Sequence, residues 1–251
     1  MGAVRQLDRA RGIARSLAMY YGKPVYSRRL ARFYRQFVGS GMLCFDIGAH
    51  VGNRSRCWLN LGARVVAVEP QPDFARMLGW WLGGRPGFTL VESALAARPG
   101  TVDLRVSRRT PTVTTASAEW ISEVQKTSGF SWVRWEEAVK VRAVTLDTLI
   151  GEHGRPDFCK IDVEGYEAEV LQGLSVALPL VSLEYLPPAI DVARRAVGRL
   201  ADLGDYRFNV SVGESMTLLW ADWRPMADVL DWLDGRKPDE GSGDIYARLQ
   251  S

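Results

Sequence analysis

The spacing of hydrophobic positions changes near residue 42 and divides the chain into two parts. Before this point, "VRQLDRARGIARSLAMYY" (4–21) and "YSRRLARFYRQF" (26–37) place apolar residues among arginines at helical spacing. This pattern predicts two basic amphipathic helices. After it, short apolar runs alternate with amphipathic segments. This alternation predicts right-handed βαβ units, and therefore an α/β fold with a seven-stranded, mostly parallel sheet.

The elements of this sheet are expected from their flanking turn signals. The expected strands lie in 42–48, 64–70, 88–96, 140–144, 157–165 and 179–186, and the expected helices in 53–62, 72–82, 166–174 and 189–204. Two further segments, "YRFNVSV" (206–212) and "SMTLLWA" (215–221), predict a closing β-hairpin around Gly213. The tail should form a short helix at 226–234 and then a loop-like end containing Gly, Pro and Asp.

Residues 99–144 interrupt the rhythm of alternating elements. "GTVDLRV" (100–106) alternates as an edge strand does, and the Thr- and Ser-rich stretch after it contains Trp120, Trp132 and Trp135. Its length and aromatic content predict a lid inserted at 107–137, whose tryptophans either pack within the lid or touch an apolar or sugar-like ligand. We therefore expect a helical cap at 1–39, an α/β domain at 40–222 that carries this lid, and a C-terminal helix and tail at 223–251.

Charge is distributed unevenly along the chain. The first 39 residues carry a net charge of +8 in a chain whose total is +3, which leaves −5 for the remainder. The basic arm lacks an interleaved stacking pattern and the rest of the chain is acidic, so nucleic acid is not an expected partner. Its apolar face is too thin for stable membrane association, and no run reaches the roughly 20 apolar residues of a membrane span. We expect the arm to pack on the domain or to face the substrate, and its exposed helices could pair two copies as a homodimer.

The chain has three cysteines and no CxxC spacing. Cys44 and Cys159 lie in apolar runs, where reduced buried thiols are common. This usage indicates a reducing compartment, and we expect the cytoplasm.

The first expected strand ends on an acid, in "CFDIGAHVGN" (44–53). Asp46 is followed by Gly48, Ala49 and Gly52, and the second strand ends at Glu69. Ligands of open parallel sheets bind beyond the carboxyl ends of the strands, and an acid at the second strand suits ribose hydroxyls. In a dinucleotide site the position of Asp46 would be a glycine beside the pyrophosphate. An anion there is better suited to S-adenosylmethionine, which carries an ammonium, a sulfonium and no phosphate.

A second group of charges ends the strand in "CKIDVEGYEAEVLQG" (159–173). On an extended strand Lys160, Asp162 and Glu164 share one face because side chains alternate with period two. They should lie near the end of the first strand. Charges that converge in this way are typical either of a functional site or of a structural ion-pair network.

Together these stretches resemble the FkbM-type methyltransferases, enzymes of the Rossmann-like class that use S-adenosylmethionine. The resemblance rests on "FDIGAHVGNRS", "VVAVEPQPD", "SALAARPGTVDL", "VTLDTL", "KIDVEGYEAEVLQGL" and "VSLEY", which occur in the family's order over roughly residues 42–186. The family usually has Asn where this chain has His50. The resemblance covers neither the basic arm nor the tryptophan-containing insertion.

The resemblance implies a class I methyltransferase fold with a defined cofactor site. The implied cofactor contacts are Asp46, Gly48, Ala49, Gly52, Asn53, Ser55, Glu69, Pro70, Ser93, Ala94 and Asp162. Within this set, Glu69 is expected at the ribose, Ser93 and Ala94 at the adenine, and Asp162 near the transferred methyl group. The implied activity is methylation of a hydroxyl of a small natural product or sugar, with methylation of nitrogen on a small molecule or peptide as the alternative.

Methyl transfer to a hydroxyl needs alignment and a destination for the proton. We expect Asp162 or Glu164 to be the base. A Mg²⁺ ion on Asp162, Glu164 and Glu184 is possible because oxygen ligands suit it, but no metal is expected. His50 is read as a turn residue and His153 as a solvated one. Two other functional classes stay open at this point: a nicotinamide-dependent oxidoreductase, and a catalytically silent binding module.

Overall fold

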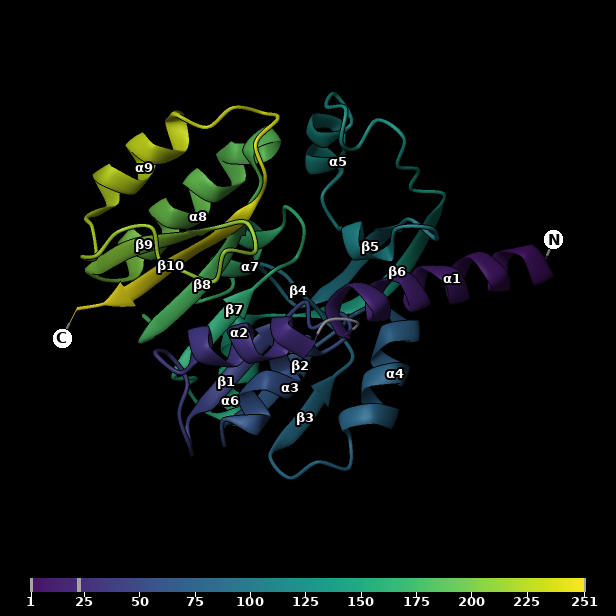
Figure 1. Ribbon diagram of the computed structural model, residues 1–251, viewed down its shortest axis with the longest axis horizontal. Helices are drawn as coiled ribbons and strands as arrows, with labels where there is room; N and C mark the ends of the chain where they lie inside the picture. The colour runs from purple at the N-terminus through teal and green to yellow at the C-terminus, as the bar shows by residue number, and fades with distance from the viewer. Residues whose placement is uncertain (1, 22–23, 251) are drawn as a thin grey trace.

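The computed structural model describes residues 2–21 and 24–250, and its centre is a seven-stranded sheet (Figure 1). The strand order is β3-β2-β1-β7-β8-β10-β9. The strands are β1 (Leu43–Ile47), β2 (Arg64–Val68), β3 (Phe88–Val91), β7 (Phe158–Ile161), β8 (Leu180–Tyr185), β9 (Tyr206–Val212) and β10 (Gly243–Leu249). All neighbours from β3 to β8 run parallel, and β10 is antiparallel to both strands beside it. The expected mostly parallel, seven-stranded α/β fold is confirmed.

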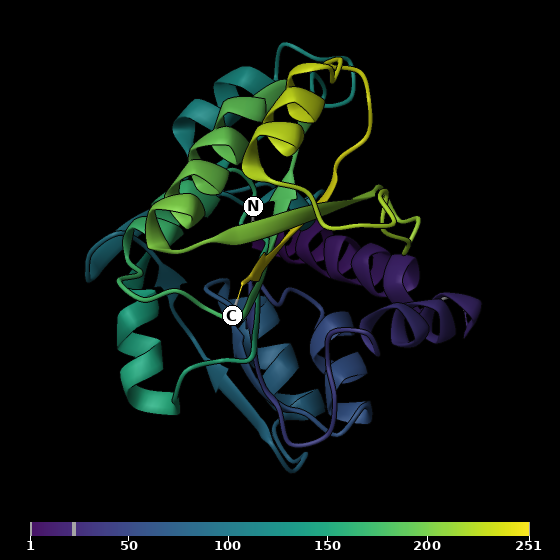
Figure 2. The same cartoon turned by 90° about the vertical axis from the view of Figure 1, so that its left-hand side faces the viewer.

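Helices cover both faces of this sheet. One layer contains α6 (Leu146–His153), α7 (Glu167–Gln172), α8 (Ile190–Leu203) and α9 (Met226–Asp234), and the other contains α2 (Pro24–Tyr34), α3 (Asn53–Asn60) and α4 (Pro72–Leu82). Figure 2 shows α8 and α9 on one side of β9 and β10 and α2 on the other. The layers follow from side-chain alternation in β1, where Phe45 packs into the first layer and Cys44 into the second.

The C-terminal segment differs from the sequence prediction. The expected hairpin between 206–212 and 215–221 is wrong, because β9 pairs with β10 along its whole length. The residues after Gly213 contact β9 without forming a strand at 215–221. Examples are the Leu219 N–H, which donates to the carbonyl of Val210 at 2.7 Å, and an isolated bridge between Phe208 and Arg224. The expected loop-like end is also wrong, because β10 lies inside the sheet between β8 and β9. Hydrophobic periodicity indicates that a segment is a strand, but it does not indicate with which other strand that segment pairs.

A second, three-stranded sheet carries the insertion. Its order is β4-β6-β5, with β4 (Ala94–Leu95), β5 (Gly100–Val106) and β6 (Glu137–Val144), so β5 is the edge strand as expected. The expected third strand, 88–96, is split between the two sheets. The insertion joins β5 to β6 and contains the 3₁₀ helix η1 (Pro111–Val113) and α5 (Ala118–Val124).

The tryptophans of the insertion mostly pack inward. Trp120 is buried against the core, and the Trp135 indole N–H donates to the carbonyl of Val113 at 2.9 Å. Trp132 is exposed. The insertion is therefore anchored in the main core.

The two N-terminal helices are formed as expected. α2 buries Leu30, Phe33 and Tyr34 in the second layer of the core. α1 (Gly2–Tyr21) crosses the insertion at Gly12, where an added Cβ would lie 2.7 Å from the carbonyl oxygen of Arg108. In the part of the chain that the structure describes, no helix combines the length and apolarity needed to cross a membrane.

Candidate functional site at the strand ends

A cavity of about 870 Å³, counting the part open to solvent, lies at the carboxyl ends of β1, β2 and β7. Its wall contains ten of the residues predicted from sequence: Asp46, Gly48, Ala49, Asn53, Glu69, Pro70, Ser93, Ala94, Asp162 and Glu164. Gly52 and Ser55, which were also predicted, do not line the cavity. The parallel strands bring these distant segments together because their carboxyl ends share one edge of the sheet.

Gly48 permits the closest approach in the site. Its φ is +81°, and a Cβ placed there would lie 1.9 Å from the carbonyl oxygen of Asp162. The loop after β1 therefore passes directly over the end of β7, and only glycine fits. The Asp162 N–H donates to the carbonyl of Ile47 at 3.0 Å, which fixes the two loops to each other.

Asp46 is held by the helix that follows the glycine loop. The Ser55 hydroxyl donates to its carboxylate at 2.5 Å. Burial raises the pKa of Asp46, and the Ser55 bond opposes that rise. Ser55 therefore orients Asp46 and does not itself line the cavity.

Glu69 ties the glycine loop to the end of β2. Its carboxylate accepts the backbone N–H groups of His50 and Gln71, both at 2.8 Å. Burial raises the pKa of Glu69 to about 7. The His50 ring packs on Phe74 with centroids 4.2 Å apart, and burial lowers the pKa of His50 to about 4, so the ring is neutral at pH 7. The backbone of His50, rather than a protonated ring, shapes this loop.

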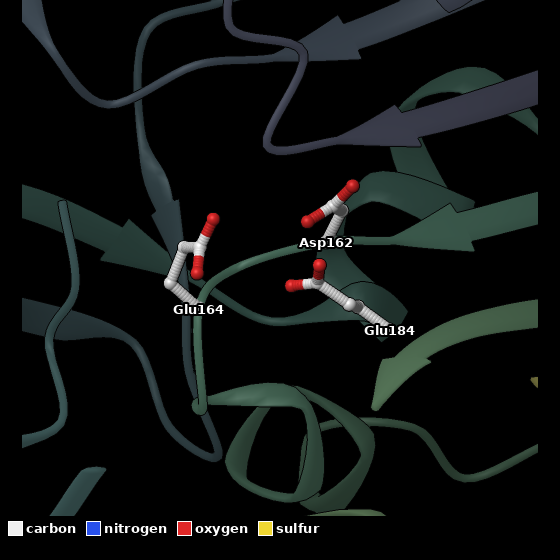
Figure 3. A group of neighbouring side chains, drawn as sticks. All are labelled: Asp162, Glu164 and Glu184. Carbon is white, nitrogen blue, oxygen red and sulfur yellow. The ribbon is translucent and has the colours of Figure 1, made fainter. Parts of the chain in front are cut away.

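Three carboxylates converge beside the cavity, from Asp162, Glu164 and Glu184. One oxygen of each lies within 4.8 Å of the others, and Figure 3 shows all three turned toward a common space. The extended-strand explanation for this grouping is wrong, because β7 ends at Ile161 and Glu164 has a φ of +54°. A left-handed turn, not strand alternation, brings Glu164 back to Asp162, while Glu184 comes from β8.

The surroundings shift the pKa values of the three carboxyl groups in different directions. Burial raises the pKa of Glu164 and of Glu184 well above the usual value, and the charge of Asp162 adds to both effects. Burial also raises the pKa of Asp162, but the cations Lys160 and Arg54 outweigh it and hold that pKa below the usual value. Of the three carboxyl groups, Asp162 is therefore the one whose ionised form the surroundings favour.

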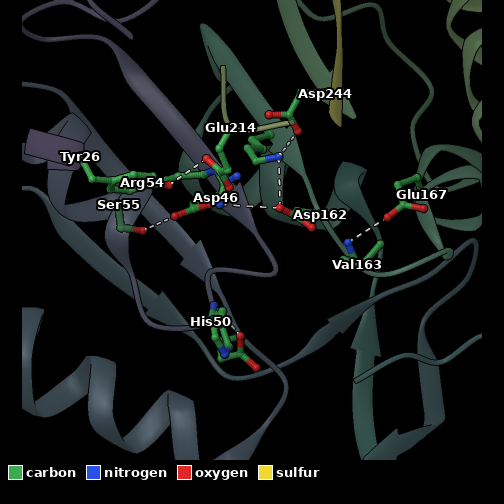
Figure 4. A network of polar contacts seen from close by, with 12 residues as sticks. Tyr26, Asp46, His50, Arg54, Ser55, Asp162, Val163, Glu167, Glu214 and Asp244 are labelled. Atoms are coloured by element: carbon green, nitrogen blue, oxygen red, sulfur yellow. Dashed lines mark hydrogen bonds and ion pairs between the residues drawn. The ribbon is translucent and has the colours of Figure 1, made fainter. Parts of the chain in front are cut away.

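A buried lysine links Asp162 to Asp244 of the last strand, two residues that Figure 4 shows in one polar network. Lys160 is fully buried, and its Nζ lies 3.2 Å from Asp162 and 2.6 Å from Asp244 on β10. The Arg54 Nη1 lies 3.7 Å from Asp162 on the other side. Asp244 and Arg54 were missed by sequence reasoning, because Asp244 lay in the expected loop-like end and Arg54 outside the glycine pattern.

The arm and the insertion complete the cavity wall. Tyr20 of α1 and the stretch Pro111 to Ala116 of the insertion, except Val113, line it. The Thr115 hydroxyl donates to the carbonyl of Glu164 at 2.6 Å, which fastens the insertion to the carboxylate group. The sequence predicted a lid and allowed an arm that faces the substrate, but it did not indicate which of their residues line the cavity.

The cavity fits S-adenosylmethionine by its unpaired polar atoms. Within the part of the chain that is described, the buried Asn53 Nδ2, Arg54 Nε and Thr114 Oγ1 have no hydrogen-bond partner. All three residues line the cavity, so a polar ligand would satisfy them. Asp46, Glu69, Ser93 and Asp162 all line the cavity, and their expected roles toward the amino-acid, ribose, adenine and methyl groups stay predictions. The carboxylates of Asp162, Glu164 and Glu184 are an oxygen set that would suit Mg²⁺.

Comparisons with known proteins agree with this reading of the chain. The family model described as "Methyltransferase FkbM domain" matches residues 46–234. The hexuronic acid methyltransferase AglP of Haloferax volcanii is 28% identical over 141 residues, which are 55% of this chain and 52% of AglP. The chain thus matches about half the length of this curated relative.

Solved structures with a similar arrangement are distant in sequence. A TehB-like SAM-dependent methyltransferase from Corynebacterium glutamicum aligns with 100% of both chains at 11% identity, with a TM-score of 0.49. An O-methyltransferase from Bacillus cereus aligns over 99% of this chain and 91% of its own at 11% identity, with a TM-score of 0.46.

Proposed function

This chain belongs to the FkbM methyltransferase family, and from that premise we propose that it transfers the methyl group of S-adenosylmethionine to a hydroxyl oxygen of a sugar-like acceptor. The observation that carries the proposal is the position of Asp162 at the cavity, with Glu164 and Glu184 beside it and with Lys160 and Arg54 favouring its ionised form. A nicotinamide-dependent reaction is disfavoured because Asp46 stands where a pyrophosphate would need a glycine.

The reaction is an in-line displacement at the methyl carbon. The cofactor supplies the electrophilic methyl group, and the protein supplies alignment and a proton acceptor. As the oxygen–carbon bond forms and the sulfur–carbon bond breaks, the acceptor O–H becomes strongly acidic. An ionised carboxylate within hydrogen-bond reach then takes that proton. Asp162 is the proposed acceptor of the proton, since burial favours the protonated forms of Glu164 and Glu184.

The acceptor class is inferred from the cavity wall and from the relative. Tyr20, Thr112, Thr114 and Tyr166 line the cavity and offer hydroxyl groups to a polyhydroxylated ligand. AglP is named for its action on a hexuronic acid, which is a sugar. We therefore propose a hexose or hexuronic acid as the acceptor. Methylation of nitrogen remains the alternative that an acceptor screen would reveal.

The cofactor is tested first, by titration calorimetry. We expect S-adenosylhomocysteine to bind and NAD not to bind. Binding of NAD alone would overturn the methyltransferase proposal. A transfer assay with radiolabelled S-adenosylmethionine then screens glucose, glucuronic acid and amino sugars, in parallel with Mg²⁺ and with EDTA. Loss of transfer in EDTA that Mg²⁺ restores would assign the carboxylate group to a metal.

The proton acceptor is tested with one substitution and a matched control. Asp162→Asn should retain cofactor binding within about tenfold and lose about 10²–10⁴-fold in turnover, the usual contribution of a general base. Asp103→Asn removes the same charge from an exposed position on β5 and should leave turnover unchanged. Normal turnover in Asp162→Asn would refute this role.

We also propose a reducing compartment, the cytoplasm, for this protein. All three cysteines are buried and free. Cell fractionation of the tagged chain in its native host checks this placement.

A further inference from the structure

A single cation faces the cavity. Arg54 is the only Lys or Arg among the described residues that line it, whereas Asp46, Glu69, Asp162 and Glu164 line it as acids. Arg54 lies in the first turn of α3, directly after the glycine loop (Figure 4). Its side chain is only 17% exposed. A buried cation in such a place requires an anionic partner.

The partners of Arg54 within the protein are incomplete. Its Nη1 lies 3.7 Å from the Asp162 carboxylate, beyond ordinary hydrogen-bond length, and that carboxylate is held more closely by Lys160 at 3.2 Å. The Tyr34 hydroxyl is a further neighbour. The buried Nε has no partner within the described chain. A guanidinium has five N–H donors and accepts none, so several donors of Arg54 are left for a ligand.

A second unpaired donor stands next to Arg54. Asn53 is 7% exposed, lines the same cavity, and its Nδ2 has no partner within the described chain. Both residues belong to the first turn of α3, whose N-cap, Gly52, supplies no side-chain cap. The first N–H groups of a helix lack partners inside the helix and favour negative charge. Arg54 and Asn53 therefore bring two side-chain donors, unpaired among the described residues, to the wall of one cavity, at the start of a helix.

We propose that Arg54 and Asn53 form a carboxylate-binding subsite within the cavity. The inference deepens the proposed function and rests on it. A planar carboxylate matches the fork of a guanidinium with two parallel hydrogen bonds. A phosphate is a poorer match, because a doubly charged group would lie close to the acids at 46 and 162.

Two ligands of the proposed reaction can bring such a carboxylate. One is the amino-acid end of S-adenosylmethionine, and the other is a hexuronic acid acceptor. The two sources are separated by pairs of compounds that differ at this group. S-adenosylhomocysteine carries the amino-acid end and 5′-methylthioadenosine lacks it. D-glucuronate carries the carboxylate and D-glucuronamide replaces it with a neutral amide.

The experiment is calorimetric titration of these four compounds into the full chain and its variants, with the sugars added to protein saturated with S-adenosylhomocysteine. Arg54→Gln removes the cation. Arg56→Gln is the matched control, because Arg56 lies on the same helix but stacks on the rings of Tyr21 and Trp81. If the cofactor is the source, Arg54→Gln should raise the Kd of S-adenosylhomocysteine about 10- to 100-fold, the range for hydrogen bonds to charged groups. It should change the Kd of 5′-methylthioadenosine less than about twofold.

The other outcomes are equally informative. In a second outcome, Arg54→Gln leaves the Kd of S-adenosylhomocysteine unchanged but loses binding of D-glucuronate and keeps binding of D-glucuronamide. This outcome assigns the carboxylate to the acceptor. Equal changes for both members of each pair, or no change in any, overturn the subsite. Arg54→Lys keeps the charge and loses the fork, so it should give an intermediate Kd and provides the test if Arg54→Gln does not fold. Failure of the unsubstituted chain to bind either nucleoside would instead overturn the proposed function.

Discussion

Replacing Asp244 by Asn should destabilise the protein, although Asp244 lies on a strand outside the residues that the family model matches. Asp244 lies on β10, whereas the family match ends at residue 234. Its carboxylate is 2.6 Å from the Nζ of Lys160, a side chain with no exposed surface. Burial alone would lower the pKa of Lys160, but Asp162 and Asp244 outweigh it and raise that pKa. The lysine is therefore charged inside the core, and Asp244 is one of its two counterions.

The expected loss follows from this geometry. Removing one partner of a buried ion pair costs about 3–5 kcal/mol when the other charge is left uncompensated. Here Lys160 keeps Asp162 at 3.2 Å, and the Asp244 side chain is 16% exposed, so part of the penalty is avoided. We expect Asp244→Asn to lower the free energy of unfolding by about 2 kcal/mol, half of that range. In a chain of this length this corresponds to a fall in Tm of about 4–8 °C.

The assay is urea denaturation followed by circular dichroism, with Asp239→Asn as a control at an exposed position near β10. The stability that Lys160 gains from a raised pKa is fully present below its ordinary value of 10.5 and is lost only as pH rises through the higher folded value. The difference between Asp244→Asn and the unsubstituted chain should therefore be constant from pH 6 to 9. A difference under about 0.5 kcal/mol, the level of ordinary surface substitutions, would refute the reasoning.

Three further predictions concern the site and the insertion. Gly48→Ala should lower the free energy of unfolding by more than about 3 kcal/mol, because the new Cβ would clash with the backbone after β7 at a residue with positive φ. Gly84→Ala places its Cβ in open space and should leave the free energy of unfolding nearly unchanged in the same denaturation assay. The affinity for S-adenosylhomocysteine should rise up to about tenfold from pH 6 to 8, because the pKa of Glu69 is raised to about 7 and ribose hydroxyls prefer the ionised carboxylate. The Glu69→Gln variant cannot ionise at this position, so calorimetric titration of that variant should show no such rise. Trp120→Ala should lower the free energy of unfolding by about 3–5 kcal/mol because the ring is buried. Trp132→Ala removes an exposed ring and should lower it by under about 1 kcal/mol. Similar losses in both variants would contradict the anchoring of the insertion in the core.

The residues at the strand ends were predictable from sequence alone. Asp46 and Glu69 each end an apolar run that is followed by a helix, and this local pattern places them at a common edge of a parallel sheet. Gly48 was predicted only as a cofactor contact, and its close approach to the backbone of Asp162 is visible only in the structure. The parallel part of the sheet, from β3 to β8, also followed from local alternation, because a parallel strand buried on both faces has a recognisable apolar run.

The tertiary structure alone decided how the site is completed. β10 enters the sheet from a tail with few local signals, and only its pairing with β8 and β9 brings Asp244 to Lys160. Glu164 joins Asp162 through a left-handed turn that period-two alternation does not foresee. The role proposed for Arg54 depends on its burial, which the neighbouring elements impose. Sequence periodicity therefore determined the parallel strands and their acidic ends. Contacts between segments far apart in the chain determined the place of β10 and which charges meet, because such contacts leave no trace in local spacing.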